Sequence, residues 1–418
     1  MKERADSVVF AKIANTTQRG AKVVVNLINK TTMNKAGYKR LGDYIREVNV
    51  RNRELKVTNL LGVSISKEFM PSIANTIGTD MSTYKIVERG QFAYGPVTSR
   101  NGDKVSIALL DDYDNAIISQ AYTVFEVTDH EQLLPKYLMM WFQRPEFDRY
   151  ARFHSHGSAR EIFDWDELCN VMLPLPSIDR QREIVSEYET LTNRIRLNNQ
   201  MIQNLEATAQ TLYRKTFVDN IDKENLPEGW RMGTLGEFGV VITGKTPSSD
   251  NPEDFGNDMP FVTPGDFEKY HKFAIGAERG LSEAGVKRLK GKVLPRGSVI
   301  VTCIGSDMGK VAIASEECIT NQQMNSIIVN RREYSDYLFY VLSFMSKELR
   351  AMALGSSTMP LLNKSDFERL GVIFPPNDLL VKFSQLLNPC NETTILKQKE
   401  NIKLTELQSL LLAKIVFP

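Results

Sequence analysis

The feature that most constrains the fold is an internal duplication. Residues 173–176 (LPLP) lead into a long helical pattern that continues to residue 217, and residues 373–376 (IFPP) lead into a second one. With Pro176 placed on Pro375, the helices align without a gap and superimpose Leu205 on Leu404, Leu212 on Leu411 and Lys215 on Lys414. A period of about 200 residues is far longer than a solenoid repeat, so each copy must be a domain with its own core. Two similar domains suggest two similar half-sites on one ligand.

Upstream of the helices the copies also correspond. The matching landmarks are residues 41–44 with 235–238, Gly90 with Gly297, residues 137–138 with 337–338, and Gly157 with Gly355. Both copies contain short strands broken by turns and then a helix, near residues 133–150 and 335–353. We therefore predict an α+β protein with an N-terminal extension (1–37), a first domain (38–176), a central long helix (177–220), a second domain (221–374) and a C-terminal long helix (375–418).

The central helix has the pattern of a coiled-coil seam. Its apolar residues alternate in steps of four and three: Ile184, Tyr188, Leu191, Ile195, Ile202, Leu205, Ala209 and Leu212. Asn198 occupies the one missing step, as a single polar position does in many coiled coils. About 36 residues would span roughly 54 Å at 1.5 Å per residue. The C-terminal helix is less regular and contains Pro389, where we expect a break or kink. Neither helix can cover its apolar stripe alone, so we predict an antiparallel pair.

Composition indicates an ordinary globular protein. Of 418 residues, 42% are hydrophobic and 25% charged, and no window approaches the roughly 18 apolar residues of a membrane span. The first residues carry acids, unlike a signal peptide, so we expect a cytoplasmic protein without a membrane partner. Four widely separated cysteines predict buried, reduced thiols.

The net charge of only +1 argues against a protein that coats nucleic acid by bulk attraction. Basic residues nevertheless cluster locally, in residues 38–57 and most clearly in 287–296, which contain three lysines, two arginines and no acid. Such a run can lie along a phosphate backbone, although it is more often a solvated face.

Signatures of catalysis are incomplete. Residues 305–311 (GSDMGKV) are one residue short of a phosphate-binding loop and lack its Ser or Thr. Residues 374–377 (FPPN) lack the amide or carboxylate that an amino-methyltransferase needs before its prolines. His154 and His156 have no third metal ligand at a suitable spacing, which favours polar loop histidines. We predict no catalytic residue and no metal site in this chain.

From about residue 38 onward the sequence resembles the specificity subunit of type I restriction-modification enzymes. The second copy carries the motifs of that family: residues 226–230 (LPEGW), 244–248 (GKTPS), Asp266, Gly305 with 309–310, 321–323 (NQQ), 355–356, Lys364 and 374–376. The first copy matches more loosely, through residues 89–95, 119–120, 157–161, 173–176 and Gln181, and has no Gly-x-Thr-Pro-Ser element.

This resemblance implies a role and partners. Each target-recognition domain would read one half of a bipartite site in double-stranded DNA, while the helices set the spacer and dock the modification subunits. The partners would be two adenine-methyltransferase modification subunits, which bring S-adenosylmethionine, and restriction (motor) subunits that use ATP and magnesium. This chain would then hold no cofactor.

Polar loop side chains are the candidates for reading bases, because Arg and Lys pair with guanine, Asn and Gln with adenine, and hydroxyls with several base edges. In the first copy they are Thr98, Ser99, Arg100, Asn101, Lys104, Gln120, His154, His156, Ser158 and Arg160. In the second copy they are Thr246, Ser248, Ser306, Lys310, Asn321, Gln322, Ser356 and Ser357. Each of these side chains could instead close a turn or cap a helix.

Two other functions compete with this one. A self-contained DNA methyltransferase would need a glycine-rich cofactor strand and an Asn-Pro-Pro-Tyr element, neither of which occurs. A coiled-coil interaction scaffold without DNA binding would explain the helices but not the duplicated domains with polar loops.

Overall fold

The computed structural model divides the chain into two compact units that share the long helices. The described residues are 37–73, 78–99, 101–102, 104–157, 161–219, 221–305, 307–354 and 361–415. One unit comprises residues 1–190 with 408–418, and the other residues 191–407. The predicted N-terminal extension, except residue 37, therefore lies outside the described residues.

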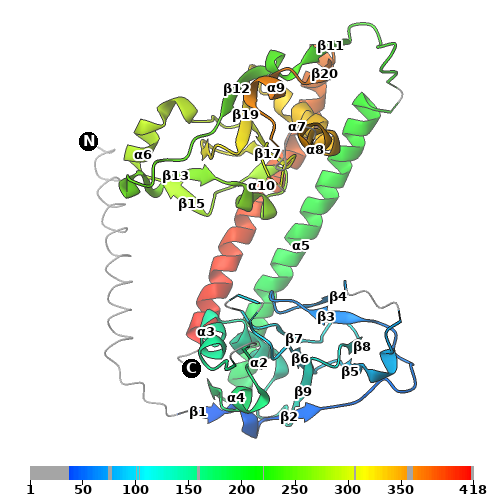
Figure 1. Cartoon of the computed structure of the whole chain (residues 1–418), viewed down its shortest axis with the longest axis vertical. Helices are drawn as coiled ribbons and strands as arrows, with labels where there is room; N and C mark the ends of the chain where they lie inside the picture. Colours follow the sequence, from blue (N-terminus) through cyan, green and yellow to red (C-terminus); the bar gives the residue numbers. More distant parts are fainter. Residues whose placement is uncertain are drawn as a thin grey trace. The chain divides into compact units, whose positions relative to one another are not determined.

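The first domain is built around a four-stranded antiparallel sheet (Figure 1). Its strand order is β2 (Ile45–Val48), β9 (Thr123–Val127), β6 (Phe92–Tyr94), β7 (Ile107–Leu109). Three further pairs are β1 (Tyr38–Arg40) with β10 (Met172–Pro174), β3 (Leu61–Val63) with β4 (Phe69–Pro71), and β5 (Lys85–Glu88) with β8 (Asn115–Ile118). The helices are α2 (Pro135–Phe142), α3 (Pro145–Phe153) and α4 (Trp165–Cys169), with the 3-10 turns η1 (Leu41–Asp43) and η2 (Met81–Thr83). In the core, Phe92 stacks on Phe125 with ring centroids 4.8 Å apart.

The second domain repeats this plan with additions (Figure 1). Its five-stranded sheet has the order β12 (Gly239–Thr243), β19 (Met324–Val329), β16 (Val299–Thr302), β17 (Val311–Ala314), β14 (Phe273–Ala274). A second sheet has the order β15 (Arg279–Leu281), β13 (Phe255–Val262), β18 (Ile319–Thr320), and β11 (Arg231–Thr234) pairs with β20 (Gly371–Phe374). The helices are α6 (Glu283–Arg288), α7 (Tyr334–Phe344), α8 (Ser346–Leu354) and α9 (Lys364–Glu368), with η3 (Leu235–Glu237), η4 (Pro252–Asp254), η5 (Pro264–Glu268) and η6 (Lys290–Lys292).

The predicted duplication is visible in equivalent contacts. The order β2-β9-β6-β7 corresponds to β12-β19-β16-β17, with antiparallel pairing throughout both. Gly90 and Gly297 both have positive φ, which suits glycine, and both end a turn that precedes an equivalent strand. The Tyr137 hydroxyl donates to the Pro174 carbonyl, and the Tyr337 hydroxyl donates to the equivalent Ile373 carbonyl. These contacts confirm two similar mixed domains.

Each helix predicted within a domain is in fact two helices. In the first domain Pro145 begins α3, and Arg144 before it is extended, because a residue that precedes proline disfavours the helical conformation. In the second domain the division falls at Met345, between α7 and α8. The prediction of one helix at 133–150 and one at 335–353 was therefore wrong, because each region contains two.

The long helices are α5 (Ile178–Phe217) and α10 (Asn377–Lys414). Their contacts show that they run antiparallel, as predicted. Near the start of α5, Ile184 shares a core with Ile415, and near its end Phe217 contacts Phe383 with rings 4.9 Å apart. Of the eight predicted apolar positions in the α5 seam, Ile184, Ile202 and Ala209 are buried and the other five are partly buried. In the last turns Tyr213 is buried more deeply than the predicted Leu212.

Two polar details of the helix pair test the sequence pattern. Asn198 is buried, and its amide donates to Asn401 Oδ1 at 2.8 Å, while the Asn401 amide donates to Asn199 Oδ1 at 2.7 Å. The polar step is therefore matched by a polar partner. Of the break or kink expected at Pro389, the break was wrong, because α10 continues through this residue. Packing on both sides of the proline, by Leu387 and Thr394, offsets the one backbone hydrogen bond that proline removes.

The environments of the four cysteines and the hydropathy of the helices can be compared with the expectations from composition. Cys169, Cys303 and Cys318 are buried free thiols, and Cys390 is partly buried. Burial raises the pKa of Cys303 to about 11 and that of Cys318 to about 12. In the described part of the chain, no helix combines the length and apolar character of a membrane span.

Candidate nucleic-acid interface

Three of the loops singled out in the second copy converge at one end of the five-stranded sheet. Strands β12 and β16 end there, at Thr243 and Thr302, and β17 and β19 begin there. Three loops follow from this register: residues 244–251, the described residues 303–305 with 307–310, and residues 321–323. We call them the second loop cluster.

Gly244 explains the Gly-Lys-Thr-Pro-Ser element. A Cβ atom on Gly244 would lie 2.1 Å from the Asn321 carbonyl oxygen and 2.3 Å from that of Thr320, so only glycine lets these loops touch. The amide of Lys245 then donates to the Thr320 carbonyl at 2.9 Å. The Thr246 hydroxyl donates to the side-chain oxygen of Gln322. Thr246 and Gln322, predicted from separate motifs, are thus brought together.

The other candidates in this cluster divide into structural and accessible ones. Asn321 is buried and closes its own turn through the Gln323 amide, so its side chain supports the loop. Ser248 is exposed but bonds Asp250 within its turn. Lys310 is half-buried and pairs with Asp307 at 2.7 Å. Of these residues, the amide end of Gln322 is best placed to present hydrogen-bond donors.

Two lysines at this cluster were not among the predicted site residues. Lys245 is exposed directly before Thr246, and the Lys292 ammonium donates to the Thr243 carbonyl at 2.9 Å, where β12 ends. The basic run 287–296 supplied the signal for Lys292, but only the fold places its ammonium beside the loops. Ammonium groups at this position suit phosphate oxygens.

The first domain has an equivalent loop cluster at the corresponding end of its sheet. Tyr94 pairs with Ile107 and Thr123, so the loops before and after these strands share one end. Residues 96–98 bond residues 161–163, through Thr98 to Glu161 at 3.0 Å and Phe163 to Pro96 at 2.8 Å. The turn at 119–122 joins the same end, since a Cβ on Gly95 would lie 3.4 Å from the Tyr122 ring. We call this the first loop cluster.

Several predicted residues of the first loop cluster hold the loops themselves. Thr98 is buried and bonds Ser155 at 2.9 Å. Asn101 bonds the Val97 carbonyl. His154 stacks on Tyr150, with centroids 4.2 Å apart, and pairs with Glu167. The candidates left exposed are Ser99, Lys104, Gln120 and His156.

A buried ion pair supports the loop that carries Lys104. The Lys67 ammonium lies 2.6 Å from Asp148 Oδ1, and the same oxygen accepts the Val105 amide at 3.1 Å. Burial lowers the pKa of Lys67, and the hydrogen bond to Asp148 opposes that shift. This pair fixes the backbone next to Lys104.

An exposed aromatic side chain beside Lys104 also escaped the sequence analysis. Phe153 is 81% exposed, and it lines an open hollow with Lys104, Arg149 and Arg152. Arg149 pairs with Glu146 and Arg152 with Glu161, so the hollow is only moderately basic. An aromatic ring next to cations can stack on a base or a sugar. In the sequence, the only indication of a role for Phe153 was its position next to the loop residue His154.

Six predicted residues lie outside the described part of the chain: Arg100, Ser158, Arg160, Ser306, Ser356 and Ser357. Among the residues that the structure does describe, no three His, Cys, Asp or Glu side chains gather as metal ligands would. Donors, hydroxyls and ammonium groups dominate both loop clusters. This chemistry suits recognition of a polyanion with readable edges.

Comparisons with known proteins agree on one family. The sequence pattern described as the type I restriction modification DNA specificity domain matches twice, over residues 24–207 and 227–406. The type I restriction enzyme HindI specificity subunit of Haemophilus influenzae is 24% identical over 90% of this chain and 97% of its own. The MjaIX specificity subunit of Methanocaldococcus jannaschii is 30% identical over 45% of this chain and 44% of its own. The crystal structure of a type I S subunit from M. genitalium has the same fold, with a TM-score of 0.58 at 13% identity, over 91% of this chain and 96% of that one.

Proposed function

Because this chain belongs to the type I restriction-modification DNA specificity family and is its DNA sequence-specificity subunit, we propose that each loop cluster reads one half of a bipartite site in duplex DNA. The observation that supports this division is the equivalence of the two sheets. Both place their polar loops at the same end of the same strand order. Two copies of one reading surface are what a two-part site requires.

The residues proposed to contact DNA are the predicted candidates that the fold leaves at least partly accessible, together with three that only the structure revealed, Phe153, Lys245 and Lys292. They are Ser99, Lys104, Gln120, His156 and Phe153 in the first recognition domain, and Lys245, Thr246, Lys292, Lys310 and Gln322 in the second. Amide and ammonium groups can pair with adenine and guanine edges, while the remaining cations contact phosphates.

The rest of the role concerns the complex. We propose that the chain itself is not catalytic, that α5 and α10 set the spacer between half-sites, and that they dock two adenine-methyltransferase subunits. S-adenosylmethionine would bind those subunits, while ATP and magnesium would serve the restriction subunits. The gapless alignment of the two helices, which superimposes Leu205 on Leu404, Leu212 on Leu411 and Lys215 on Lys414, supports two equivalent docking positions.

A reciprocal domain exchange tests this function. The first domain (38–176) or the second (221–374) is replaced by that of a relative with another target, in cells that carry the whole locus, and methylated adenines are mapped by sequencing. Each exchange should change one half of the site and leave the other half unchanged. An exchange that alters both halves, or a locus without a bipartite methylated site, would contradict the proposal.

A further inference from the structure

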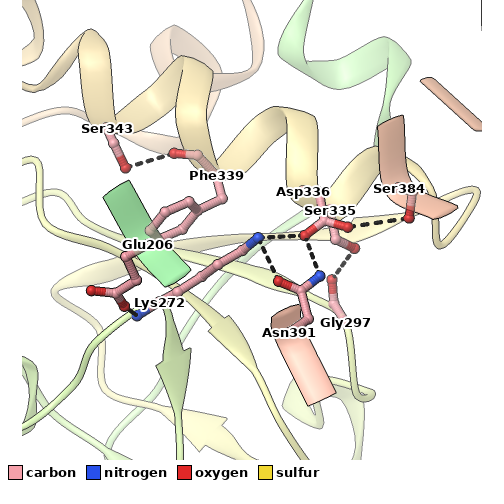
Figure 2. A network of polar contacts seen from close by, with 9 residues as sticks. All are labelled: Glu206, Lys272, Gly297, Ser335, Asp336, Phe339, Ser343, Ser384 and Asn391. Carbon is pink, nitrogen blue, oxygen red and sulfur yellow. Dashed lines mark hydrogen bonds and ion pairs between the residues drawn. The ribbon is translucent and has the colours of Figure 1, made fainter. Parts of the chain in front are cut away.

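A buried polar cluster joins the second recognition domain to both long helices (Figure 2). The Lys272 ammonium, at the edge of the five-stranded sheet, lies 2.5 Å from Asp336 Oδ1 of α7 and 2.9 Å from Asn391 Oδ1 of α10. Asp336 also accepts the Asn391 amide at 2.9 Å and the Ser384 hydroxyl at 3.1 Å. On the other side, the Lys272 backbone amide donates to Glu206 Oε1 of α5 at 3.0 Å. We call these five residues the buried clamp.

The ion pair at the centre of the buried clamp, Lys272 with Asp336, lies in an apolar environment. Only 3% of the Lys272 side chain and 7% of the Asp336 side chain are exposed, and the ammonium lies 5.0–5.6 Å from the ring centroids of Phe273, Phe339 and Tyr340. Burial lowers the pKa of Lys272, while the Asp336 charge opposes that shift. Removing two charges from water costs nearly as much as their attraction returns, so such a pair adds little net stability. Its contribution must be sought elsewhere.

The hydrogen bonds of the buried clamp add a geometric requirement that an apolar contact lacks. The second domain already packs on the helices through a large apolar core that includes Tyr213, Phe217 and Phe383. Apolar contacts tolerate sliding and repacking with small losses. Hydrogen bonds to a buried charge do not, because a displaced partner leaves that charge unsatisfied. A cluster that bonds α5 and α10 at once permits one placement of the domain on both helices.

We propose that the buried clamp is a specificity device: it fixes the placement of the second recognition domain on the helix pair and thereby the length of spacer that the subunit accepts. The inference rests on the proposed function, since a spacer exists only if two half-sites are read. Lys272, Asp336 and Asn391 are then positioning residues that act through the loop cluster and contact no base. Helix length alone would leave neighbouring spacers in competition.

The test is the double substitution Lys272→Met with Asp336→Leu, which removes both charges and keeps the volume, so that the fold is retained. The full chain is expressed with its locus, and methylation is measured at sites whose spacers differ by one base pair from the native length. We expect the preference for the native spacer to fall by about tenfold, equivalent to 1.4 kcal/mol. Both half-site sequences should stay unchanged. Asn391→Leu should give the same change in a smaller degree.

Leu281→Ala is the matched control. Leu281 is buried in a separate apolar cluster of the same domain with Phe261, Leu289 and Ile319, so this change destabilises the domain without touching the buried clamp. Its spacer preference should equal that of the native chain. An unchanged spacer preference in the double variant, loss of the second half-site sequence itself, or equal broadening by Leu281→Ala would each overturn the inference. A native chain that methylates no bipartite site would instead refute the proposed function.

Discussion

The two recognition domains share a topology but are fastened to the helices by opposite chemistry at one equivalent position. Where the first domain has Lys136 at the start of α2, the second has Asp336 in α7. Lys136 pairs with Asp111 at 2.9 Å and with Glu189 of α5 at 2.5 Å, but its side chain is 42% exposed. Asp336 is buried, and its carboxylate pairs with the Lys272 ammonium of the same domain. The same position in the fold therefore forms a surface ion pair in the first domain and a buried hydrogen-bonded ion pair in the second.

At the starts of the two long helices, the buried polar contact belongs to the first domain and the apolar one to the second. Gln181 of α5 is fully buried, accepts the Leu134 amide at 2.9 Å and donates to the Gln132 and Pro176 carbonyls at 2.8 and 3.0 Å. The residue that aligns with it in α10 is Leu380, which is buried in the apolar core. Each domain therefore uses one directional polar anchor on its helix, but at different sites. Duplication preserves the architecture while the chemistry of attachment diverges.

The largest expected effect separates the buried anchor from the exposed one. Lys272→Met leaves Asp336 buried without its cation, and should destabilise the second domain by about 3–5 kcal/mol. Lys136→Met removes a solvated pair and should cost less than about 1 kcal/mol. Hydrogen exchange of the α7 and α2 amides measures the two domains separately. Equal losses of protection would show that burial does not distinguish the two attachments.

The polar anchor of the first domain can be tested at Gln181. Gln181→Leu imitates Leu380 but leaves one backbone amide and two carbonyls without partners, so we expect a loss of about 2 kcal/mol in unfolding free energy. Gln398→Leu is the control. Gln398 is also buried, and its side-chain oxygen has no hydrogen-bond partner among the described residues. Urea denaturation measures the unfolding free energy of both variants, with Gln181→Leu acting on the first domain and Gln398→Leu on the second. If both substitutions lower it equally, the side-chain amide of Gln181 does not anchor the first domain.

The asparagines between the helices offer an uncharged comparison with the buried clamp. Replacing both Asn198 and Asn401 with Leu removes both members of the buried pair and leaves only the partly exposed Asn199 without its donor, which water can replace. This double substitution should raise the unfolding free energy by about 1 kcal/mol. Asn198→Leu alone should not stabilise the chain, because Asn401 then loses one partner. Thermal unfolding of the two variants decides the point. A destabilised double variant would mean that the seam depends on its polar step.

The smallest effect concerns pH and the Glu206 end of the buried clamp. Glu206 accepts a hydrogen bond from His271, which raises the pKa of that imidazole above its ordinary value of 6.5. Since the folded pKa is raised, the contribution is complete below pH 6.5 and is lost as the pH rises through the raised value. The stability difference between the native chain and Glu206→Gln should therefore shrink from about pH 6 to about pH 8, by less than about 1 kcal/mol. Gln keeps an oxygen for the Lys272 amide, and a difference independent of pH would exclude the ion pair.

Local patterns predicted most of the fold. The proline-led starts of the helices and the polar step at Asn198 depend on neighbours within a few residues, and each appears where expected. The seam predicted from Ile184 to Leu212 is at least partly buried along its length. The failures have local and nonlocal causes. Pro145 divides a helix by its own backbone restriction, whereas Pro389 does not break α10, because packing along the helix outweighs the lost hydrogen bond.

The candidate site was predicted at the level of loops and not of side chains. Residue type nominated Thr98, Asn321 and His154 as readers, yet all three side chains have structural contacts within the domain. Asn321 closes its own turn, Thr98 bonds Ser155 of another loop, and His154 packs on Tyr150 and pairs with Glu167. The exposed Phe153 and the placement of Lys292 could not be read from type, because exposure depends on what the rest of the domain covers.

By itself the sequence determined the duplication, the order of elements, the antiparallel helices and the family, because periodicity and turn residues act over short distances. Tertiary structure alone decided which charges are buried. Lys272, Asp336 and Asn391 are ordinary polar residues far apart in the chain, and nothing near any of them predicts a partner. A buried ion pair exists only once three elements exclude water from one place, and that exclusion is a property of the fold.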